Sequence, residues 1–452
     1  MQEPKKIIIV GGNAAGPAAA AKAKRVNPNA DVILFEAGNF ISTGTCELPY
    51  LFSGEIEDYN KIVNFTPDTF LAKKGVRVFT NHFVKSINSK NKEIEVIDRK
   101  TSHIKQFNYD KLILTTGSSA KELPDLPFSL ENVFSLKSVH DYIKIKDFIK
   151  GNEIEKVLVI GSGYIGLEIA DSLKKAGYNV SILEKENLPF PHGDKEVQFL
   201  INDLLVQNNI KFLSASSNNG FITKNNRFTQ LKHEGRFLDF DLAIVAVGVV
   251  PNISVAENAG LKIGNLGGIS VDSRLKTSDP NIFAAGDNIE IKNYLTKQND
   301  YIPLATYAHS YGHIAGENAS GGNKIAEPVI PNSAFQVCGK FIAQVGLSEI
   351  QAKKYFVNSA SVSAVANNKV KVMPNSQKVF GKIIFDRRLK IILGASFVGG
   401  NEVSGYTDII SVMIYNKIPV DNLISYNFNY TPPLSPFVNL LSILGRKIKE
   451  II

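Results

Sequence analysis

Two stretches of this chain share one pattern, and this pattern constrains the fold more than any other feature. The first is KKIIIVGGNAAGPAAAAKAKR (5–25) and the second is KVLVIGSGYIGLEIADSLKKAG (156–177). Each begins with an apolar, β-branched run, turns at glycines and continues into residues that favour a helix. Each is followed by another apolar run that ends on an acid, Glu36 or Glu184. The pattern predicts two βαβ units of the Rossmann type.

The second unit carries a complete glycine signature of a dinucleotide site. Gly161, Gly163 and Gly166 follow the strand, and Glu184 comes about twenty residues later. The glycines let the backbone approach a pyrophosphate at a helix N-terminus, and the acid accepts a hydrogen bond from the ribose. The acid would repel a 2′-phosphate, which favours NADH, while Lys185 beside it leaves NADPH open.

The first unit departs from this signature. Gly11 and Gly16 are present and Glu36 is correctly placed, but Asn13 stands where the second glycine belongs. A plain βα turn is the alternative, and the second copy favours a dinucleotide site. Two dinucleotides in one chain suggest electron transfer between a nicotinamide donor and a tightly held flavin.

The rest of the chain completes an α/β architecture. Beyond about residue 325, alternating runs predict an antiparallel sheet, followed by helices around 405–416 and 437–450. We expect two Rossmann-like dinucleotide-binding domains and an α+β C-terminal domain. The expected order is a first domain in two parts, 1–120 and 249–325, a second domain at 121–248, and a C-terminal domain at 326–452.

Composition excludes several classes of protein. The two cysteines, Cys46 and Cys338, cannot form a disulfide framework and fit a reducing cytoplasm. No run reaches the roughly 18 apolar residues of a membrane span. The net charge of +8 comes from scattered lysines, which indicates a solvated surface. We expect no nucleic-acid partner, no membrane association and no metal site.

An ordered set of motifs resembles one known family over nearly the whole chain. The motifs are GGNAAG, TCELPY, TTG, GSGYIGLE, IFAAGDN and YTPPLSP. They resemble the FAD-dependent pyridine nucleotide–disulfide oxidoreductases. Within them the chain is similar to the single-cysteine branch, which contains coenzyme A-disulfide reductase, NADH oxidase and NADH peroxidase. The resemblance implies FAD, NADH or NADPH as cofactors, and a homodimer joined through the C-terminal domain.

The resemblance also implies site residues. Asp287 would hold the flavin ribityl chain, Tyr164 would act as a lid over the nicotinamide, and Tyr430 would reach the partner subunit's active site. The alternatives are a helix cap for Asp287 and a packed aromatic for Tyr430. The implied FAD residues are Gly11, Asn13, Ala14, Ala15, Gly16, Glu36, Thr116, Gly117, Asp287 and Ala305. The implied NAD(P)H residues are Gly161, Gly163, Tyr164, Ile165, Gly166, Glu168 and Glu184.

Cys46 would carry the chemistry. Dithiol members of the family have a second cysteine five residues later, where this chain has Leu51. Cys46 would therefore hold a mixed disulfide with a low-molecular-weight thiol, or a sulfenic acid. A helix N-terminus or a flavin beside it would favour the thiolate. The alternative is a small buried hydrophobe, which is our interpretation of Cys338, placed in an apparent strand.

The acceptor is the open question. The oxidase and peroxidase branch carries a histidine where this chain has Ala14, while LPY and Ser42 around Cys46 resemble the coenzyme A-disulfide reductase branch. Glu47 and Met373 depart from that branch. We expect a coenzyme A disulfide, persulfide or polysulfide; an NADH oxidase and a slow redox-sensing flavoprotein are the alternatives. The candidate substrate residues are Ser42, Thr45, Lys24, Arg25 and Lys74, the basic ones being equally consistent with a solvated surface.

Overall fold

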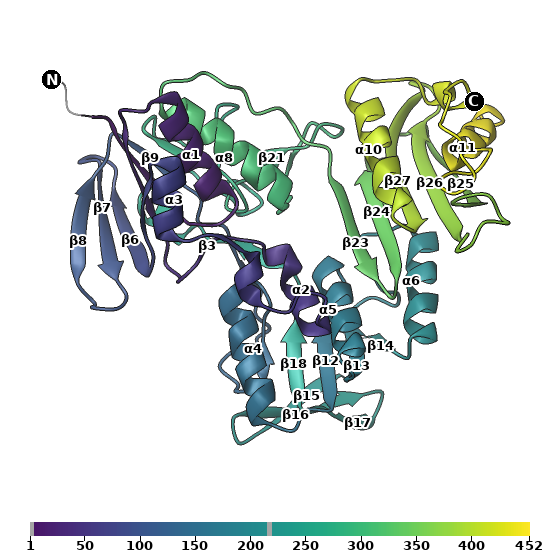
Figure 1. Ribbon diagram of the computed structural model, residues 1–452, viewed down its shortest axis with the longest axis horizontal. Coiled ribbons are helices and arrows are strands. Elements are labelled where there is room, and N and C mark those ends of the chain that lie inside the picture. The colour runs from purple at the N-terminus through teal and green to yellow at the C-terminus, as the bar shows by residue number, and fades with distance from the viewer. Residues whose placement is uncertain (1–3, 215–218) are drawn as a thin grey trace.

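The computed structural model describes residues 4–214 and 219–452, which fold into three lobes (Figure 1). Residues 1–3 and 215–218, which fall inside the first two predicted segments, lie outside the described residues. Each lobe is built on a sheet of its own, and the predicted fold class is confirmed. The domain boundaries drawn from the sequence stay predictions.

The N-terminal lobe contains a parallel sheet with strand order β20-β9-β1-β2-β5. The apolar run Ile7–Ile9 is fully buried at its centre, as expected for a strand covered on both faces. Late in the chain β20 pairs with β9, so the chain leaves this lobe and returns to it. The sheet and its helices are β1 (Lys6–Val10), α1 (Ala15–Val26), β2 (Asp31–Phe35), α3 (Pro67–Lys74), β5 (Arg77–Phe79), β9 (Lys111–Leu114), β20 (Ile282–Ala284) and α8 (Ala305–Ala319).

Shorter elements flank this sheet. An antiparallel sheet of β6 (His82–Asn88), β7 (Glu93–Asp98) and β8 (Ile104–Asn108) lies at one side (Figure 1). The segment after β2 contains β3 (Ile41–Thr43), the 3₁₀ turn η1 (Thr45–Glu47), α2 (Leu48–Ser53), η2 (Tyr59–Ile62) and β4 (Val63–Phe65). The remaining elements are β10 (Ser118–Ala120), β19 (Val249–Pro251), α7 (Ser254–Asn258), β21 (Ile291–Lys292) and β22 (Asn299–Asp300).

The middle lobe repeats the first architecture. Its parallel sheet has the order β11-β18-β12-β13-β14, and α2 of the N-terminal lobe lies beside its helix α5 (Figure 1). The elements are β11 (Val133–Phe134), α4 (Val139–Gly151), β12 (Lys156–Ile160), α5 (Tyr164–Lys175), β13 (Asn179–Glu184), α6 (Lys195–Gln207), β14 (Lys211–Ser214), β15 (Gly220–Lys224), β16 (Arg227–His233), β17 (Arg236–Asp239) and β18 (Leu242–Val245).

The C-terminal lobe contains the predicted antiparallel sheet, in the order β23-β24-β27-β26-β25. The two helices predicted near the end of the chain are present. Cys338 corrects one expectation, because it lies in the turn between β23 and β24 with a φ of 49° rather than in a strand. The elements are β23 (Asn332–Val337), β24 (Lys340–Gly346), α9 (Glu349–Tyr355), β25 (Ser359–Asn367), β26 (Lys378–Asp386), β27 (Ile391–Gly399), α10 (Glu402–Tyr415), η3 (Val420–Ile424) and α11 (Leu440–Lys449).

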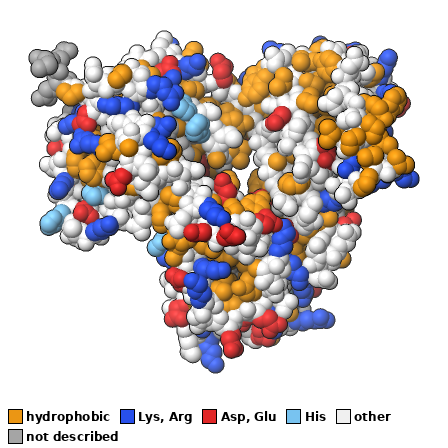
Figure 2. All heavy atoms as spheres, viewed as in Figure 1, with side chains coloured by type: hydrophobic (Ala, Val, Ile, Leu, Met, Phe, Trp, Pro, Cys, Tyr) orange, Lys and Arg blue, Asp and Glu red, His pale blue; other side chains and the backbone are white. Residues whose placement is uncertain are grey.

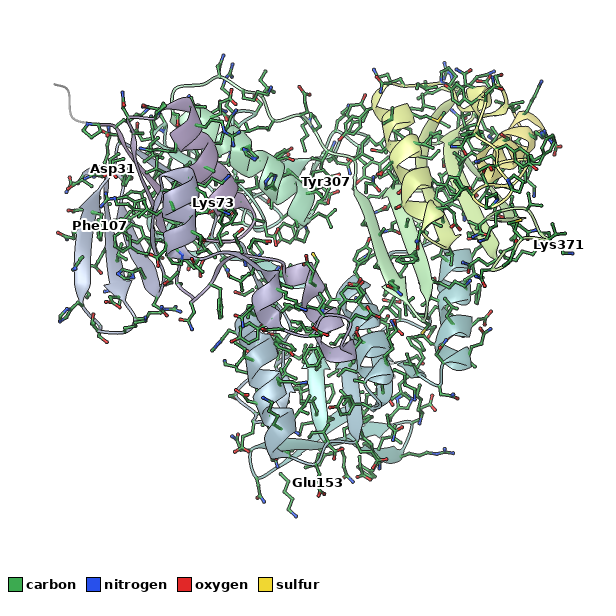
Figure 3. All side chains as sticks on the ribbon, in the orientation of Figure 1. Asp31, Lys73, Phe107, Glu153, Tyr307 and Lys371 are labelled. Carbon is green, nitrogen blue, oxygen red and sulfur yellow. The ribbon has the colours of Figure 1, made fainter. Side chains whose placement is uncertain are left out.

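The crossing of α1 and α8 positions the first glycine turn. A Cβ added at Gly312 would lie 2.3 Å from the Ala15 carbonyl oxygen, and one at Gly316 would lie 2.2 Å from that of Ala19. The helices therefore meet backbone to backbone, which only glycine permits. Tyr307 on α8, labelled in Figure 3, donates a hydrogen bond to the Ile330 carbonyl at the start of the C-terminal lobe. Among the described residues, no helix is long and apolar enough to cross a membrane.

Candidate functional site

The first glycine turn is held by hydrogen bonds to Glu36, the acid that follows the next strand. Gly11 has a φ of 107°, and a Cβ at Gly16 would lie 1.9 Å from the Gly11 carbonyl oxygen. The Glu36 carboxylate accepts hydrogen bonds from the N–H groups of Gly12 and Gly38, each at 2.6 Å. Burial raises the pKa of Glu36 and outweighs these bonds. Because Gly11 and Gly12 carry no side chains, the backbone of the turn can approach a phosphate closely at these two positions.

Asn13, which replaces the second glycine, has a partner within the protein. Its Oδ1 accepts hydrogen bonds from the Thr43 N–H at 2.9 Å and from Thr43 Oγ1 at 2.8 Å. Ala14 follows with a φ of 25°, and α1 begins at Ala15. The departure from the glycine pattern thus binds this turn to β3, which leads to Cys46.

Residues that fit a flavin converge beside this turn. Asn288 is fully buried; its Nδ2 donates to the Leu114 carbonyl and to Thr116 Oγ1, while its Oδ1 has no partner among the described residues. The Asp287 carboxylate accepts a hydrogen bond from Ser118 Oγ at 2.9 Å and pairs with Lys137 Nζ at 3.2 Å. This buried acceptor without a donor, near the glycines of the first turn, fits a large polar cofactor such as FAD.

The other predicted flavin residues border the same place. Gly117 has a φ of 66°, and Thr116 Oγ1 donates to the Asn252 carbonyl at 2.6 Å. Ala305 begins α8, one turn before Ala308, whose Cβ is 3.7 Å from a Cβ added at Gly286. Asp287 does not cap a helix, since it lies between β20 and β21.

The second glycine turn repeats the geometry of the first. Gly161 has a φ of 98°, and a Cβ at Gly166 would lie 2.0 Å from the Gly161 carbonyl oxygen. The buried Glu184 carboxylate accepts hydrogen bonds from the Ser162 N–H at 2.8 Å and from Ser162 Oγ at 2.7 Å. A Cβ at Gly163 would meet nothing within 4 Å. Open space at that position leaves room for a nucleotide.

Tyr164 and Ile165 begin α5 and differ in exposure. Ile165 is exposed. The Tyr164 ring packs against Phe335 of β23 with a centroid distance of 5.2 Å, and its hydroxyl bonds Ser333 Oγ at 3.0 Å and Gln344 Nε2. The predicted nicotinamide lid is therefore anchored to the C-terminal lobe.

Glu168 lies where all three lobes meet. Its carboxylate accepts a hydrogen bond from Tyr50 Oη at 3.0 Å, and the Gln336 N–H of β23 also bonds it. Burial raises the pKa of Glu168 to about 7. A carboxyl group that titrates near neutral pH is common at functional sites.

Cys46 is exposed in η1, immediately before α2. Although the side chain reaches solvent, the protein atoms around the sulfur partly desolvate it and raise the pKa of the Cys46 thiol, and the charges of Glu47 and Glu168 raise it further. The Lys137 ammonium acts in the opposite direction. The expected help from a helix N-terminus or a flavin stays a prediction. Cys338 is partly buried with its pKa raised to about 12 by burial, which agrees with a packing role.

The predicted substrate residues fall into two groups. Ser42 and Thr45 lie close to Cys46 in the chain. Ser42 is in β3 with a φ of 51°, and Thr45 begins the η1 turn that contains Cys46. Lys24 donates from Nζ to the Ala30 carbonyl, and its stem lies 3.2 Å from a Cβ added at Gly75.

Lys24 therefore lies beside the end of α3, next to Lys74, whose Nζ is 5.8 Å from the Phe65 ring centroid. Arg25 is exposed in the last turn of α1. The structure thus places the basic residues at the far ends of α1 and α3, and not next to Cys46.

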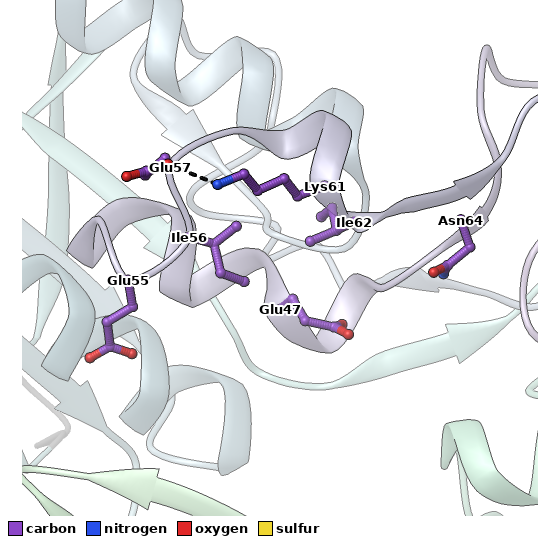
Figure 4. Close-up of a pocket in the computed structure, with 7 residues that line it drawn as sticks. All are labelled: Glu47, Glu55, Ile56, Glu57, Lys61, Ile62 and Asn64. Atoms are coloured by element: carbon purple, nitrogen blue, oxygen red, sulfur yellow. Dashed lines mark hydrogen bonds and ion pairs between the residues drawn. The ribbon is translucent and has the colours of Figure 1, made fainter.

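A hollow of about 410 Å³ includes Glu47, the residue that follows Cys46 in the chain, in its lining (Figure 4). Its carboxylates outnumber its single lysine, and Lys61 pairs with Glu57 at 2.8 Å. The Glu47 carboxylate lies against the backbone of Gly44: a Cβ added at Gly44 would be 2.5 Å from Glu47 Oε2. The hollow is lined by Glu47, Glu55, Ile56, Glu57, Lys61, Ile62 and Asn64.

Tyr430 is exposed and packs edge-on against Phe437 at a centroid distance of 5.3 Å. The loop that contains Met373 and the segment after Tyr430 border one hollow of about 320 Å³. Figure 2 shows hydrophobic side chains gathered on the C-terminal lobe, where Leu434 is also exposed. The hollow is lined by Asn368, Lys369, Asn375, Gln377, Asn401, Glu402, Pro433 and Leu434.

Two residues of the site were missed from the sequence. Tyr50 ends the ELPY stretch, which was noted only as a branch marker, although its position four residues after Cys46 could have directed attention to it. Lys137 precedes α4 and has no local pattern that distinguishes it from other lysines.

Comparison with known proteins places this geometry in a family. Residues 5–312 match the pyridine nucleotide-disulphide oxidoreductase family, and residues 333–440 match its dimerisation domain. The chain is 29% identical to an NADH oxidase of Methanocaldococcus jannaschii, with 95% of each covered. It is 29% identical to a coenzyme A disulfide reductase of Staphylococcus aureus, with 98% of this chain and 100% of that protein covered.

A solved structure agrees over the same length. The NAD-dependent persulfide reductase from A. fulgidus has a TM-score of 0.94 and 28% identity, with 99% of this chain and 83% of that chain covered. Its named activity differs from those of the two relatives above, so the comparisons agree on the type of enzyme and not on one acceptor. The chain belongs to the FAD- and NAD(P)H-binding pyridine nucleotide-disulphide oxidoreductases, and is an NAD(P)H-dependent flavoprotein oxidoreductase with a dimerisation domain.

Proposed function

We propose that this chain passes electrons from NAD(P)H through FAD to Cys46 and on to a low-molecular-weight disulfide. The proposed acceptor is coenzyme A disulfide or a coenzyme A persulfide or polysulfide. One observation carries the proposal: the exposed Cys46 lies within electrostatic reach of both Asp287, at the flavin site, and Glu168, at the nucleotide site. Leu51 stands where a second cysteine would complete an internal disulfide.

The residues around the two turns would hold the cofactors. FAD would lie on the first turn with Glu36 at its ribose and Asp287 at its ribityl chain, and would supply transfer of a hydride equivalent from nicotinamide to sulfur. NAD(P)H would lie on the second turn, from Gly161 to Gly166, under Tyr164. Since the Glu184 carboxylate would repel a 2′-phosphate, NADH is the proposed donor.

Cys46 would act by thiol–disulfide exchange. The thiolate is the attacking form, and it displaces one thiolate from the incoming disulfide. Burial and the carboxylates of Glu47 and Glu168 raise the thiol pKa, so the Lys137 ammonium is the group that favours ionisation. We expect slow exchange at neutral pH, quickening as the pH rises.

The protein is proposed to work as a cytoplasmic homodimer. The dimerisation domain carries exposed apolar side chains at Leu434 and Phe437, which a second copy would cover. Tyr430 would then enter the partner subunit's active site. Ser42, Thr45, Lys24, Arg25 and Lys74 stay proposed substrate contacts, with Lys24, Arg25 and Lys74 suited to the phosphates of coenzyme A.

Mass spectrometry of the purified protein tests the acceptor. The proposal predicts a coenzyme A adduct on Cys46 that NADH releases, and NADH oxidation that coenzyme A disulfide accelerates. The matched control is Cys338→Ser, which should behave as wild type, whereas Cys46→Ser should lose the disulfide-dependent rate. A bare Cys46 together with no response to the disulfide would reject the proposal.

An NADH oxidase is the second candidate, and the hollow of about 410 Å³ favours it. Glu47, Glu55 and Glu57 line that hollow. Glu55 pairs with Lys175 and Glu57 pairs with Lys61, so the Glu47 carboxylate is the charge that opposes the phosphates of coenzyme A. Oxygen is neutral and would not be repelled. Oxygen consumption faster than disulfide reduction, abolished in Cys46→Ser, would reverse the order of the two candidates.

A further inference from the structure

The connection between Glu184 and α6 contacts the second glycine turn through Phe190. Phe190, midway along it, is fully buried with a φ of 58°, a conformation that a bulky side chain rarely adopts. Its N–H donates to the carbonyl oxygen of Ser162 at 3.1 Å and to Ser162 Oγ at 3.2 Å. The same Ser162 binds the Glu184 carboxylate. Phe190 therefore contacts Ser162, the residue that links the second glycine turn to Glu184.

The far end of this connection is buried in the C-terminal lobe. Asp194 accepts a hydrogen bond from the Glu349 N–H at 2.8 Å and one from Ser396 Oγ at 3.2 Å. Two residues later, the Glu196 carboxylate accepts a hydrogen bond from Lys382 Nζ at 2.8 Å. Lys382 projects from β26, is only 2% exposed, and also bonds Glu349 Oε2. A single buried ammonium thus lies among three carboxylates from both lobes.

The middle of the connection packs on the same lobe. The Phe190 ring lies 5.0 Å from the Phe335 ring and 5.2 Å from the Tyr164 ring, centroid to centroid. Tyr164 in turn bonds Ser333 and Gln344. The Tyr164 and Phe190 rings, which pack against each other beside the nucleotide turn, therefore both rest on Phe335 of the C-terminal sheet.

Lys382 is the group on which this arrangement depends. Burial opposes its charge, but the hydrogen bonds that it donates to Glu196 and Glu349 outweigh burial and raise its pKa. Its removal would leave Asp194 and Glu196 without the ammonium that lies between them and Glu349, which keeps only Lys353. Removing one partner of a buried ion pair is strongly destabilising because an uncompensated charge stays behind. The N-terminus of α6 would then move away from the sheet, and Phe190 would move with it.

We propose that Lys382 is a positioning residue for the nicotinamide nucleotide, through which the C-terminal domain holds the second glycine turn in its binding geometry. The proposal rests on the assignment of this turn to NAD(P)H and not on the identity of the acceptor. Lys382 touches no nucleotide in this account; it acts through Asp194, Phe190 and Ser162. Its loss should therefore weaken nucleotide binding while the steps after binding proceed as before.

The test compares Lys382→Met with Lys390→Met in the flavin-containing enzyme. Lys390 is a half-exposed lysine at the edge of the same domain and pairs with Asp421 at 3.4 Å, so its loss controls for a deleted salt bridge. Calorimetric titration with NAD⁺ should show about tenfold weaker binding for Lys382→Met, which corresponds to about 1.4 kcal/mol. Lys390→Met should bind NAD⁺ as wild type. The KM for NADH should rise in parallel with little change in kcat.

Two further measurements separate positioning from general damage. Flavin content should be unchanged in Lys382→Met, since the flavin is assigned to the first turn. Ser396→Ala removes only one hydroxyl from Asp194 and should fold even if Lys382→Met does not; it should weaken NAD⁺ binding a few-fold. Lowered thermal stability with NAD⁺ affinity equal to wild type in both variants would overturn the proposal. NAD⁺ titration involves no acceptor, so a wrong acceptor leaves this result intact.

Discussion

The two glycine turns share the same backbone hydrogen bonds but contact different parts of the molecule. In both, an acid at the end of the next strand bonds the backbone N–H that follows the first glycine: Glu36 to Gly12, and Glu184 to Ser162. In both, a helical glycine lies against the carbonyl of the first one. The shared acid and the shared helical glycine therefore stabilise the βαβ unit in both domains.

The turns differ at the next two positions, and there they gain separate roles. Asn13 in the first turn bonds Thr43 and so faces the Cys46 segment. The second turn has Gly163 there, followed by Tyr164, which reaches the C-terminal sheet. The comparison teaches that the residues that break the pattern decide which part of the molecule each turn supports.

The largest predicted effect comes from the helical glycine of the second turn. In Gly166→Ala the new Cβ would meet the Gly161 carbonyl oxygen at 2.0 Å, so the strand and helix must move apart. We expect a loss of about 3 kcal/mol of stability, the upper range for overpacking, and loss of NAD⁺ binding. Urea unfolding and calorimetry measure both.

Gly163→Ala is the matched control, since its Cβ meets nothing within 4 Å. It should keep wild-type stability and reveal only steric interference with the nucleotide. Equal destabilisation by the two alanines would contradict the packing argument.

A second prediction concerns a variant in which the first turn receives the glycine that the second turn has at the same position. Asn13→Gly removes the acceptor for two hydrogen bonds from Thr43, which should cost about 1–2 kcal/mol in unfolding free energy. Because β3 leads to Cys46, iodoacetamide should also alkylate Cys46 faster than in wild type. Unchanged alkylation and stability would mean that Asn13 does not tie the turn to the cysteine.

A third prediction concerns acid stability where the second turn is anchored. Burial opposes ionisation of Glu349, but hydrogen bonds from Lys353 and Lys382 outweigh it and lower its pKa to about 2. A lowered pKa stabilises the fold above the unfolded pKa, and this contribution is lost as the pH falls from about 4.5 towards 2. Glu349→Gln should flatten this part of the stability–pH curve. Curves of identical shape would contradict the assignment.

The smallest predicted effect links the nucleotide side to the cysteine. Glu168 has a pKa of about 7, so it is mainly neutral below pH 7 and mainly charged above it. Its charge opposes the Cys46 thiolate. Glu168→Gln should therefore speed alkylation of Cys46 a few-fold above pH 7 and leave it unchanged well below. Slower alkylation at high pH would show that Glu168 assists the thiol instead of opposing it.

The sequence predicted what depends on local pattern. The glycine spacing, the acids at Glu36 and Glu184 and the antiparallel C-terminal sheet all follow from periods of a few residues. The pairs that complete the site could not be predicted in this way. Lys137 and Asp287, or Tyr50 and Glu168, are separated by more than a hundred residues, and a single sequence carries no signal that joins them.

The surroundings of Cys46 could not be predicted for a related reason. Its raised pKa depends on burial and on carboxylates brought together from separate segments, whereas the sequence suggested a helix N-terminus or a flavin beside the sulfur. Lys382 is similar, because nothing near it in β26 indicates that its partners lie on α6 and α9.

Anaerobic titration of the oxidised enzyme with NADH tests the central claim most directly, with flavin absorbance as the readout. If the oxidised enzyme holds Cys46 in the proposed mixed disulfide, NADH will cleave that S–S bond through the flavin, and wild type will consume one more equivalent of NADH per flavin than Cys46→Ser before the flavin is fully reduced. The Cys338→Ser control should match wild type. Equal consumption by wild type and Cys46→Ser would contradict the account.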